Sequence, residues 1–278
     1  MVSQSARPAW PSPGGGSAHE ALTDRLHLEP VGPGVFLRPG RPAERHLFGG
    51  LLAGQAVRAA SLTVTGDKPA SSVHGHFLAG GDGRRPIEYR VDTTRDGRSF
   101  STRRVEVTQD GGSLFVATVS FHAPEAGPDY QPSPPAGVPG PEGLASGRYV
   151  SPWFDSRDVP EGRADAGPHR RLAWFRAWKP MPDDQDLHQQ AVVYLTDHGA
   201  TRGVRQPHAA HPRIEERMSV SLDHSVWLHA PARADEWLLS EFHPLATGAG
   251  RGLAAGSVWT RHGRLVASVT QEALLRLP

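Results

Sequence analysis

Residues 49–60 read GGLLAGQAVRAA, and this short stretch decides the fold. From residue 51 onward it is built of small and apolar residues, and only Gln55 and Arg58 interrupt them. A helix on a protein surface shows a charged face to water, and this run is too apolar to supply one. We therefore expect a helix over residues 51–60 that is enclosed by other parts of the chain.

Strand patterns follow this helix, and the same order of elements recurs in the second half of the chain. A second helix is expected over Leu187–Asp197, and turn signals at 109–112 and 262–263 each join two strands into a hairpin. The expected strands are Ser72–Leu78, Ile87–Thr94, Ser99–Thr108, Ser113–His122, Met218–His229, Glu236–His243, Gly252–Thr260 and Arg264–Leu275. One apolar helix against an antiparallel sheet in each half predicts an α+β fold.

The two halves resemble each other at a shift of 150 residues, which indicates an internal duplication. The shift places FVATVSF (115–121) on LVASVTQ (265–271), and it places His74 on His224. Residues 122–150 contain 7 prolines and 5 glycines, 12 of 29 residues, as is typical of a linker. The expected organisation is listed here in chain order: a flexible tail over 1–20, an N-terminal module over 21–122, a Pro/Gly-rich linker over 123–169 and a C-terminal module over 170–278.

The composition excludes several classes of protein. Lys and Arg total 30 against 29 Asp and Glu, a formal charge of +1, and there is no basic stripe for a nucleic acid. The chain has no cysteine, which excludes disulfides, thiolate metal sites and a cysteine nucleophile and suits a reducing compartment. No apolar run approaches the roughly 18 residues of a membrane span, and residues 1–20 lack the apolar core of a signal peptide. We expect a cytoplasmic protein with no membrane span and no nucleic-acid partner.

Other chemical signals in the sequence are weak. His74 and His76 share a strand face, but no further cluster completes a metal site. The loop GAGRG (248–252) precedes a strand pattern, whereas a phosphate-binding loop opens a helix, and no G-x-S-x-G motif marks a serine hydrolase. Three arginine pairs could meet ligand phosphates, although such pairs are more often simply solvated. They are Arg84-Arg85, Arg103-Arg104 and Arg170-Arg171.

Several motifs in the same order resemble the acyl-CoA thioesterase II family. They are RHLFGGLLAGQA (45–56), PIEYRVDTTRDGRSFSTRRV (86–105), WFRAWKPMPDDQDLHQQAVVYLTD (174–197), LDHSVWLHAP (222–231), EWLL (236–239) and LVASVTQE (265–272). The resemblance covers roughly residues 25–122 and 170–276. It implies a fused double hotdog, with two antiparallel sheets each wrapped around a central helix. It also implies hydrolysis of an acyl-CoA substrate to a free acid and CoA, a reaction of lipid metabolism, and the sequence shows no need for a cofactor.

The resemblance further implies three catalytic side chains around an attacking water, Asp197, Ser221 and Gln271. A thioester carbonyl is electrophilic and its thiolate leaves readily, so a water held by a base and a second polar group suffices. The residues alone also allow a structural interpretation of each: a helix-end carboxylate, an ordinary strand serine and an edge glutamine facing solvent. Against this, Gln271 closes an otherwise apolar strand face, and its counterpart in the repeat is Phe121. A buried amide there needs a hydrogen-bond partner.

Two assignments stay open at this point. Asp223 has the strand parity of Ser221 and is a rival base, ranked below Asp197 by the family position alone. Gly49 and Gly50 directly precede the first expected helix. Backbone N–H groups at a helix start suit an oxyanion and glycines allow close approach of a substrate, but the same glycines could serve only to let the helix pack tightly. The sequence departs from the family pattern near the expected pocket, which leaves the acyl preference undetermined. The departures are Thr196 and His198, where the family typically has Ser and an aromatic residue, Ala230, where it commonly has Arg, and Gly250, where it usually has Ala.

Two other functions are compatible with these residues. One is a pathway-specific biosynthetic hotdog thioesterase acting on an unusual CoA or carrier-protein thioester, which the long linker and the altered pocket positions favour. The other is a non-catalytic acyl-CoA binding protein, which retention of the Asp, Ser and Gln disfavours. The sequence does not fix the oligomeric state, and a homo-oligomer of double hotdogs is compatible with it.

Overall fold

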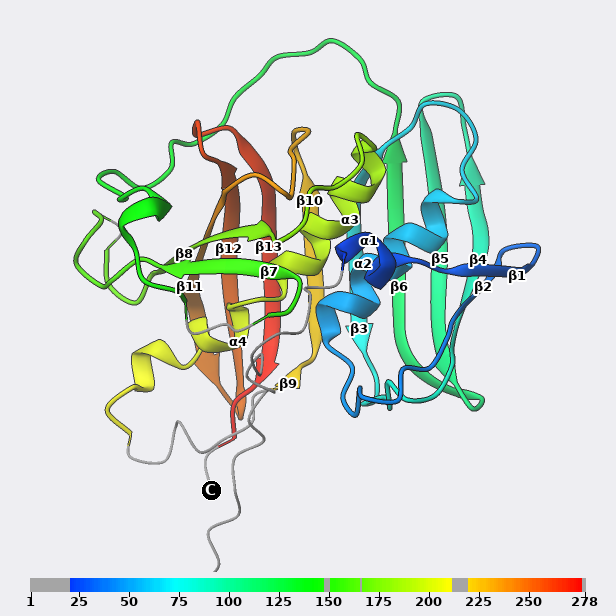
Figure 1. The fold of residues 1–278 in the computed structure, drawn as a ribbon, viewed down its shortest axis with the longest axis horizontal. Coiled ribbons are helices and arrows are strands. Elements are labelled where there is room, and N and C mark those ends of the chain that lie inside the picture. Colours follow the sequence, from blue (N-terminus) through cyan, green and yellow to red (C-terminus); the bar gives the residue numbers. More distant parts are fainter. Residues whose placement is uncertain (1–20, 148–150, 166, 212–219, 277–278) are drawn as a thin grey trace, which may run out of the picture.

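The helices and strands follow the predicted order, with additional elements before each central helix and directly after the second one (Figure 1). The structure is a computed structural model that describes residues 21–147, 151–165, 167–211 and 220–276. The tail expected over 1–20 and the first two residues of the strand expected from Met218 lie outside these ranges. The elements of the first half are α1 Leu22–Leu26, β1 Glu29–Gly32, β2 Val35–Arg38, α2 Gly49–Ser61, β3 Ala70–Phe77, β4 Ile87–Asp96, β5 Phe100–Gln109 and β6 Gly112–His122.

The second half repeats a helix followed by strands, preceded by two strands of its own. Its elements are the 3-10 helix η1 Pro141–Gly143, β7 Phe154–Asp158, β8 Arg171–Ala177, α3 Gln185–Thr196, α4 Ala200–Gly203, the 3-10 helix η2 Gln206–His208, β9 Val220–Ser221, β10 Asp223–Leu228, β11 Leu238–Gly248, β12 Arg251–Thr260 and β13 Leu265–Leu274. Strand β7 lies inside the segment that the sequence indicates as a linker, and it pairs with β8.

All of these strands belong to one antiparallel sheet of 13 strands, in the order β1-β2-β4-β5-β6-β3-β10-β13-β12-β11-β8-β7, with β9 paired to β13. The two antiparallel sheets expected from the sequence are thus joined edge to edge in a single sheet. The two halves join because β3 pairs with β10 along five residues, from His76↔Asp223 to Ser72↔Trp227. Each of these strands would otherwise leave an edge of unpaired N–H and C=O groups, and pairing them satisfies both edges.

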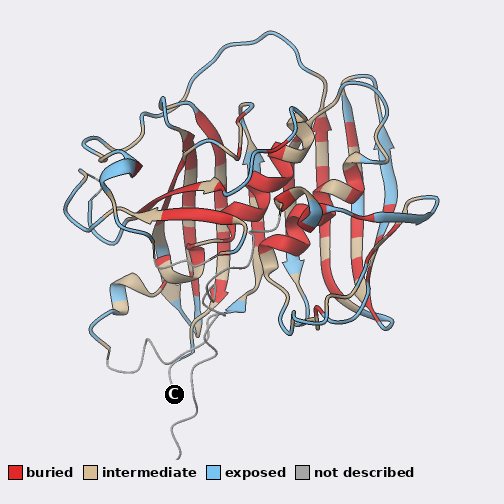
Figure 2. Ribbon diagram, viewed as in Figure 1, coloured by how far each residue is buried: buried red, intermediate tan, exposed pale blue. Residues whose placement is uncertain are grey.

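Helices α2 and α3 lie side by side against the sheet and form the buried centre of the molecule (Figures 1 and 2). From Gly50 to Ala60 every residue of α2 except Arg58 is buried, as the uncharged sequence predicts. The helices run antiparallel and very close, because two glycines of α2 face the backbone of α3. A Cβ on Gly54 would lie 2.9 Å from the carbonyl oxygen of Gln190, and one on Gly50 would overlap the carbonyl of Tyr194. This contact brings the first turn of α2 against the last turn of α3.

Local sequence signals set both ends of α3. The side chain of Asp184 caps the helix by accepting the N–H groups of Asp186 and Leu187. At the other end Asp197 is the C-cap, and Gly199 adopts φ 117°, a conformation that favours glycine. The helix therefore ends at Thr196 and places Asp197 at the junction of the two halves.

The strand registers show that one shift of 150 does not relate both repeated segments. It would carry the Val73–Val119 pair of β3 and β6 onto Asp223 and Val269, but Val269 pairs with Val226, three residues further. Because successive side chains alternate between faces, an odd slip exchanges the two sides of a strand. His224 is accordingly buried and His74 only half-buried, so these two residues are not equivalent as the sequence comparison proposed.

Candidate active site

Three predicted site residues, Asp197, Ser221 and Gln271, meet at the end of α3. The Gln271 amide nitrogen Nε2 donates to Asp197 Oδ1 at 2.8 Å and to Ser221 Oγ at 2.6 Å. Ser221 Oγ also donates to Asp197 Oδ1, at 3.3 Å. Asp197 is 7% exposed and Gln271 is fully buried, whereas Ser221 is half-buried. The serine therefore lies on the solvent side of the group.

The first half of the chain contributes a fourth contact. The backbone N–H of Gly50, in the first turn of α2, donates to Asp197 Oδ2 at 2.7 Å. Both the hydrogen bond and the positive end of the helix dipole favour the ionised carboxylate. A Cβ on Gly49 would lie 2.8 Å from the same oxygen, so glycine keeps this approach open. The sequence suggested two roles for Gly49 and Gly50, as oxyanion donors or as small residues for close helix packing. It did not predict their contact with Asp197.

The electrostatic environment makes Asp197 a stronger base than an exposed carboxylate. Burial raises the pKa of Asp197, and the hydrogen bonds from Gln271, Gly50 and Ser221 oppose that rise without cancelling it. A carboxylate with a raised pKa binds a proton more strongly. Asp197 is therefore suited to accept a proton from water near neutral pH.

A buried histidine lies behind this group and was not among the residues predicted from the sequence. His224 on β10 is 1% exposed, and its Nε2 contacts the Thr196 hydroxyl at 2.9 Å. Burial lowers the pKa of His224. The DHS step of residues 223–225 is the sequence signal that contains it.

Two departures from the family pattern have a structural explanation. Thr196 keeps a hydroxyl, which donates to the Val193 carbonyl at 2.8 Å and contacts His224. His198 takes an aromatic position, because its ring stacks on Phe48 at 4.4 Å. Burial lowers the pKa of His198 to about 4, so the ring is neutral at pH 7 and packs like an aromatic side chain.

The rival base has a different role. Asp223 Oδ1 accepts the backbone N–H of Glu272 at 2.7 Å, a contact that holds the start of β10 against β13. Among the described residues, those that hydrogen-bond Asp197 are Gly50, Ser221 and Gln271 and do not include Asp223. The structure therefore brings Asp197, and not Asp223, into contact with Ser221 and Gln271.

The other signals noted in the sequence do not converge on the site. The ring of His74 packs edge-on against Trp227 at 5.0 Å. Arg103 is buried and bonds Thr63 at the end of α2, and Arg170 pairs with Glu241. Within the described ranges, no group of three or more His, Asp or Glu side chains could hold a metal ion. In the same part of the chain, no helix has the length and apolar character needed to cross a membrane.

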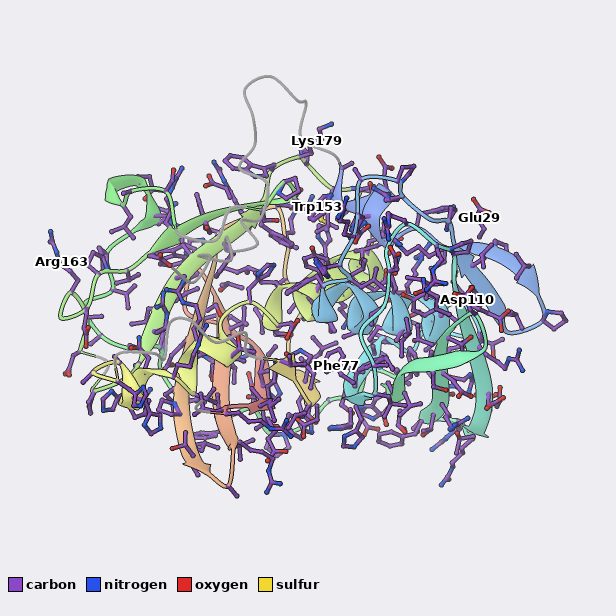
Figure 3. All side chains as sticks on the ribbon, turned by 90° about the horizontal axis from the view of Figure 1, so that it is seen from below. Glu29, Phe77, Asp110, Trp153, Arg163 and Lys179 are labelled. Carbon is purple, nitrogen blue, oxygen red and sulfur yellow. The ribbon has the colours of Figure 1, made fainter. Side chains whose placement is uncertain are left out.

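Phe77, at the end of β3, lies close to Gly49 and to the carboxylate of Asp197. Its ring lies 2.9 Å from the position of a Cβ on Gly49, a position that is also 2.8 Å from Asp197 Oδ2. Figure 3 shows Phe77 beside the central helices, where the first half of the sheet meets the second. Phe77, Gly49 and Ser221 are half-buried, whereas Asp197 behind them is buried.

Comparison with protein families identifies relatives of both halves of the chain. The sequence model of the acyl-CoA thioesterase N-terminal domain matches residues 37–122, and that of the acyl-CoA thioesterase C-terminal domain matches residues 121–275. Human acyl-coenzyme A thioesterase 8 is 32% identical over 289 residues, which cover 92% of this chain and 89% of the relative. Acyl-CoA thioesterase 2 of Haemophilus influenzae is 30% identical over 253 residues, covering 84% of this chain and 88% of the relative.

Solved structures extend the likeness to three dimensions. The acyl-CoA thioesterase II TesB2 from Mycobacterium marinum has a TM-score of 0.84 and 35% identity, covering 93% of this chain and 99% of that one. A protein from Alicyclobacillus acidocaldarius with a hot dog fold has a TM-score of 0.75 at 19% identity, covering 92% and 98%, and shows that the fold is of this type. Both domain matches and the relatives of at least 30% identity place the chain in one family: it belongs to the acyl-CoA thioesterases.

Proposed function

We propose that this acyl-CoA thioesterase cleaves its substrate with a water molecule held by Asp197, Ser221 and Gln271. The observation that carries the proposal is the mutual hydrogen bonding of these three side chains at a buried carboxylate. Three polar groups from three separate elements meet there, and the half-buried Ser221 gives the group a side open to substrate.

In the proposed reaction Asp197 is the general base. The carboxylate takes a proton from the water while the water oxygen bonds to the thioester carbon, and Ser221 and Gln271 hold the water and the carboxylate in place. The tetrahedral intermediate then expels the CoA thiolate as the carbon–sulfur bond breaks, and the proton on Asp197 passes to the thiolate. Atoms and charge balance with one water consumed and no covalent acyl-enzyme.

The oxyanion of this intermediate needs hydrogen-bond donors of its own. The N–H of Gly50 is already donated to Asp197, so we assign this role to the N–H of Gly49, one residue earlier in the first turn of α2. Donors at the start of a helix suit a developing negative charge, and each oxyanion donor contributes about 10²–10³-fold to the rate.

The fold behind this site is, in our proposal, a fused double hotdog whose two half-sheets share one ladder at β3 and β10. The duplication then offers a second, symmetry-related position at the opposite ends of the helices. Its strand residue there is Phe121, which is buried and apolar where β13 carries Gln271. We therefore propose one active site per chain. The module boundaries at 122 and 170, the cytoplasmic location, the absence of a nucleic-acid partner and a homo-oligomeric state stay predictions from the sequence.

Alanine variants of Gln271 and Ser221 test the proposed function. Gln271→Ala is expected to lower kcat about 10²-fold, because the amide positions both partners, and Ser221→Ala about tenfold. Both hydrogen bonds also lower the pKa of Asp197, so removing either one raises that pKa further. The acid limb of the pH–rate profile, where the base becomes protonated, should then move to higher pH in both variants.

The measurement is CoA release from a panel of acyl-CoA substrates across pH, with thermal unfolding as the control for folding. Unchanged kcat in both variants would remove these residues from the site. Loss of activity with an acid limb that stays in place would leave Asp197 without its proposed role as the titrating base.

A further inference from the structure

The buried histidine behind the site has no role in the proposed mechanism, although it lies against one of the three side chains that do. Ser225 on β10 pairs with Thr270 on β13, so one step further along this ladder His224 lies across from Gln271. His224 is 1% exposed and Gln271 is 0% exposed. On its other side β10 pairs with β3, where the residue opposite His224 is Gly75, which has no side chain. The imidazole therefore has its hydrogen-bond partners on α3 and β13.

These partners engage both nitrogens of the imidazole. Nε2 of His224 lies 2.9 Å from the hydroxyl of Thr196 at the end of α3. The side chains of His224 and Gln271 also share a hydrogen bond. The two nitrogens of an imidazole point away from each other, and Nε2 faces Thr196. The nitrogen that bonds Gln271 is therefore Nδ1.

The amide of Gln271 decides which group donates in this bond. Its Nε2 donates to Asp197 Oδ1 and to Ser221 Oγ, and these two bonds use both of its protons. The atom left for His224 is the amide oxygen Oε1, which can only accept. Nδ1 of His224 therefore carries a proton and donates it to Oε1. Because burial lowers the pKa of His224, the ring is neutral near pH 7, and its single N–H proton is the one on Nδ1.

We propose that His224 is a positioning residue: by donating its Nδ1–H to Oε1 of Gln271, it holds the amide nitrogen of Gln271 toward Asp197. This inference rests on the proposed function of Asp197 and Gln271.

A glutamine amide needs such a contact because its two ends have nearly the same size and shape but opposite hydrogen-bonding roles. A donor at Nδ1 of His224 favours the orientation in which Oε1 of Gln271 faces the ring and Nε2 faces Asp197. The reverse orientation would set N–H against N–H on one side and oxygen against a carboxylate oxygen on the other, and both contacts are unfavourable. His224 thus acts on Asp197 through the amide.

The same contact bears on the step in which Asp197 returns its proton. When Asp197 has taken the proton of the attacking water, a free amide would turn its oxygen toward the new O–H group. The amide held by His224 keeps its N–H toward Asp197, so the protonated carboxyl gains no new acceptor from Gln271. The proton then passes more readily to the CoA thiolate.

The pKa of Asp197 reports this role. The hydrogen bond from Gln271 lowers that pKa. Without a donor at position 224 the amide is free to turn over, its donation to Asp197 weakens, and the pKa of Asp197 rises. A positive charge on His224 would act in the same direction, since the carboxylates that act on the imidazole are Asp197 at the end of α3 and Asp223 on its own strand. The substitutions must therefore separate the hydrogen bond from a charge.

Two neutral substitutions achieve this. Asparagine at position 224 carries an amide N–H near the place of Nδ1 and keeps the donor to Gln271. Glutamine extends past that place toward Thr196 and lacks the donor. We expect His224→Gln to lower kcat about tenfold with KM unchanged and to move the acid limb of kcat to higher pH. His224→Asn should keep kcat within about threefold and leave the acid limb in place. The measurement is CoA release across pH, with thermal unfolding as the control for folding.

The same measurements in the Gln271→Ala background complete the test. Because His224 acts through the amide, adding His224→Gln to Gln271→Ala should cost no further activity. Equal losses in the two His224 variants, an acid limb that moves equally in both, or additive losses in the double variant would overturn the proposal. If Gln271→Ala alone keeps full activity, the proposed function fails and this inference with it, whereas a slow Gln271→Ala beside a fully active His224→Gln refutes only the role of His224.

Discussion

Replacing Asp197 with asparagine is expected to lower kcat for acyl-CoA hydrolysis by about 10²–10⁴-fold, the range that a general base contributes. The two side chains have the same size and shape, so the change removes the proton acceptor and leaves the surrounding packing in place. Substrate binding should change little, because Asp197 acts on the water and not on the acyl group. The measurement is steady-state CoA release, with kcat and KM determined separately.

The matched control is Asp223→Asn, the same substitution 26 residues further along the chain. Its side-chain oxygen still accepts the N–H of Glu272, so most of the activity should remain. The opposite result, an active Asp197→Asn beside an inactive Asp223→Asn, would make Asp223 the base and reverse the assignment.

Replacing Gly50 with alanine is expected to destabilise the fold by about 1–3 kcal/mol and to abolish most of the activity. The added methyl group would overlap the backbone carbonyl of Tyr194 and lie 2.5 Å from the ring of Phe48. A backbone carbonyl inside α3 cannot rotate away as a side chain can, so α2 must move. That movement withdraws the Gly50 N–H from Asp197. Urea unfolding gives the change in stability, and CoA release gives the change in rate.

Gly127→Ala is the control, because no atom lies within 4 Å of the position of its Cβ. It should unfold at the wild-type urea concentration and keep the wild-type rate. A Gly50→Ala protein as stable and as active as Gly127→Ala would show that the close approach of α2 and α3 is not required.

The sequence predicted both central helices to within two residues at each end. Helix α2 was predictable because an uncharged run such as LLAGQAV cannot face water, and the observed helix spans Gly49–Ser61. Helix α3 was expected over Leu187–Asp197 and spans Gln185–Thr196, since Asp184 supplies the N-cap two residues earlier than the apolar run suggested. Strands β12 and β13 were equally clear, because the turn at 262–263 separates them. Strand β11 instead continues past the expected end at His243 to Gly248, and the described part of the strand expected over Met218–His229 is divided into β9 and β10.

What the sequence did not predict are the contacts between distant segments. Strands β1, β2, β7 and β8 have 4 to 7 residues, too few for a clear periodicity. The Pro33-Gly34 turn between β1 and β2 was not used in the prediction. The pairing of β3 with β10 depends on two edges that are 147 residues apart at the His76↔Asp223 pair. A local sequence pattern does not show which strand edges pair with each other.

The same reason explains what was found and missed in the site. Asp197, Ser221 and Gln271 were named through the family resemblance, and the structure brings them into contact. The donation from Gly50 and the place of His224 follow from the register of helices and strands, which only the fold determines. The three-residue slip between the repeats further hid His224, because the sequence comparison set it against the half-buried His74.

The central claim is that water, and not a side chain, attacks the thioester. A single turnover of enzyme in excess over acyl-CoA, run in H₂¹⁸O, tests it most directly. Direct attack by water predicts that the acid released in the first turnover carries one ¹⁸O atom and that the enzyme carries none. Unlabelled acid together with ¹⁸O in the carboxyl group of Asp197 would show a covalent acyl-aspartate and contradict the account.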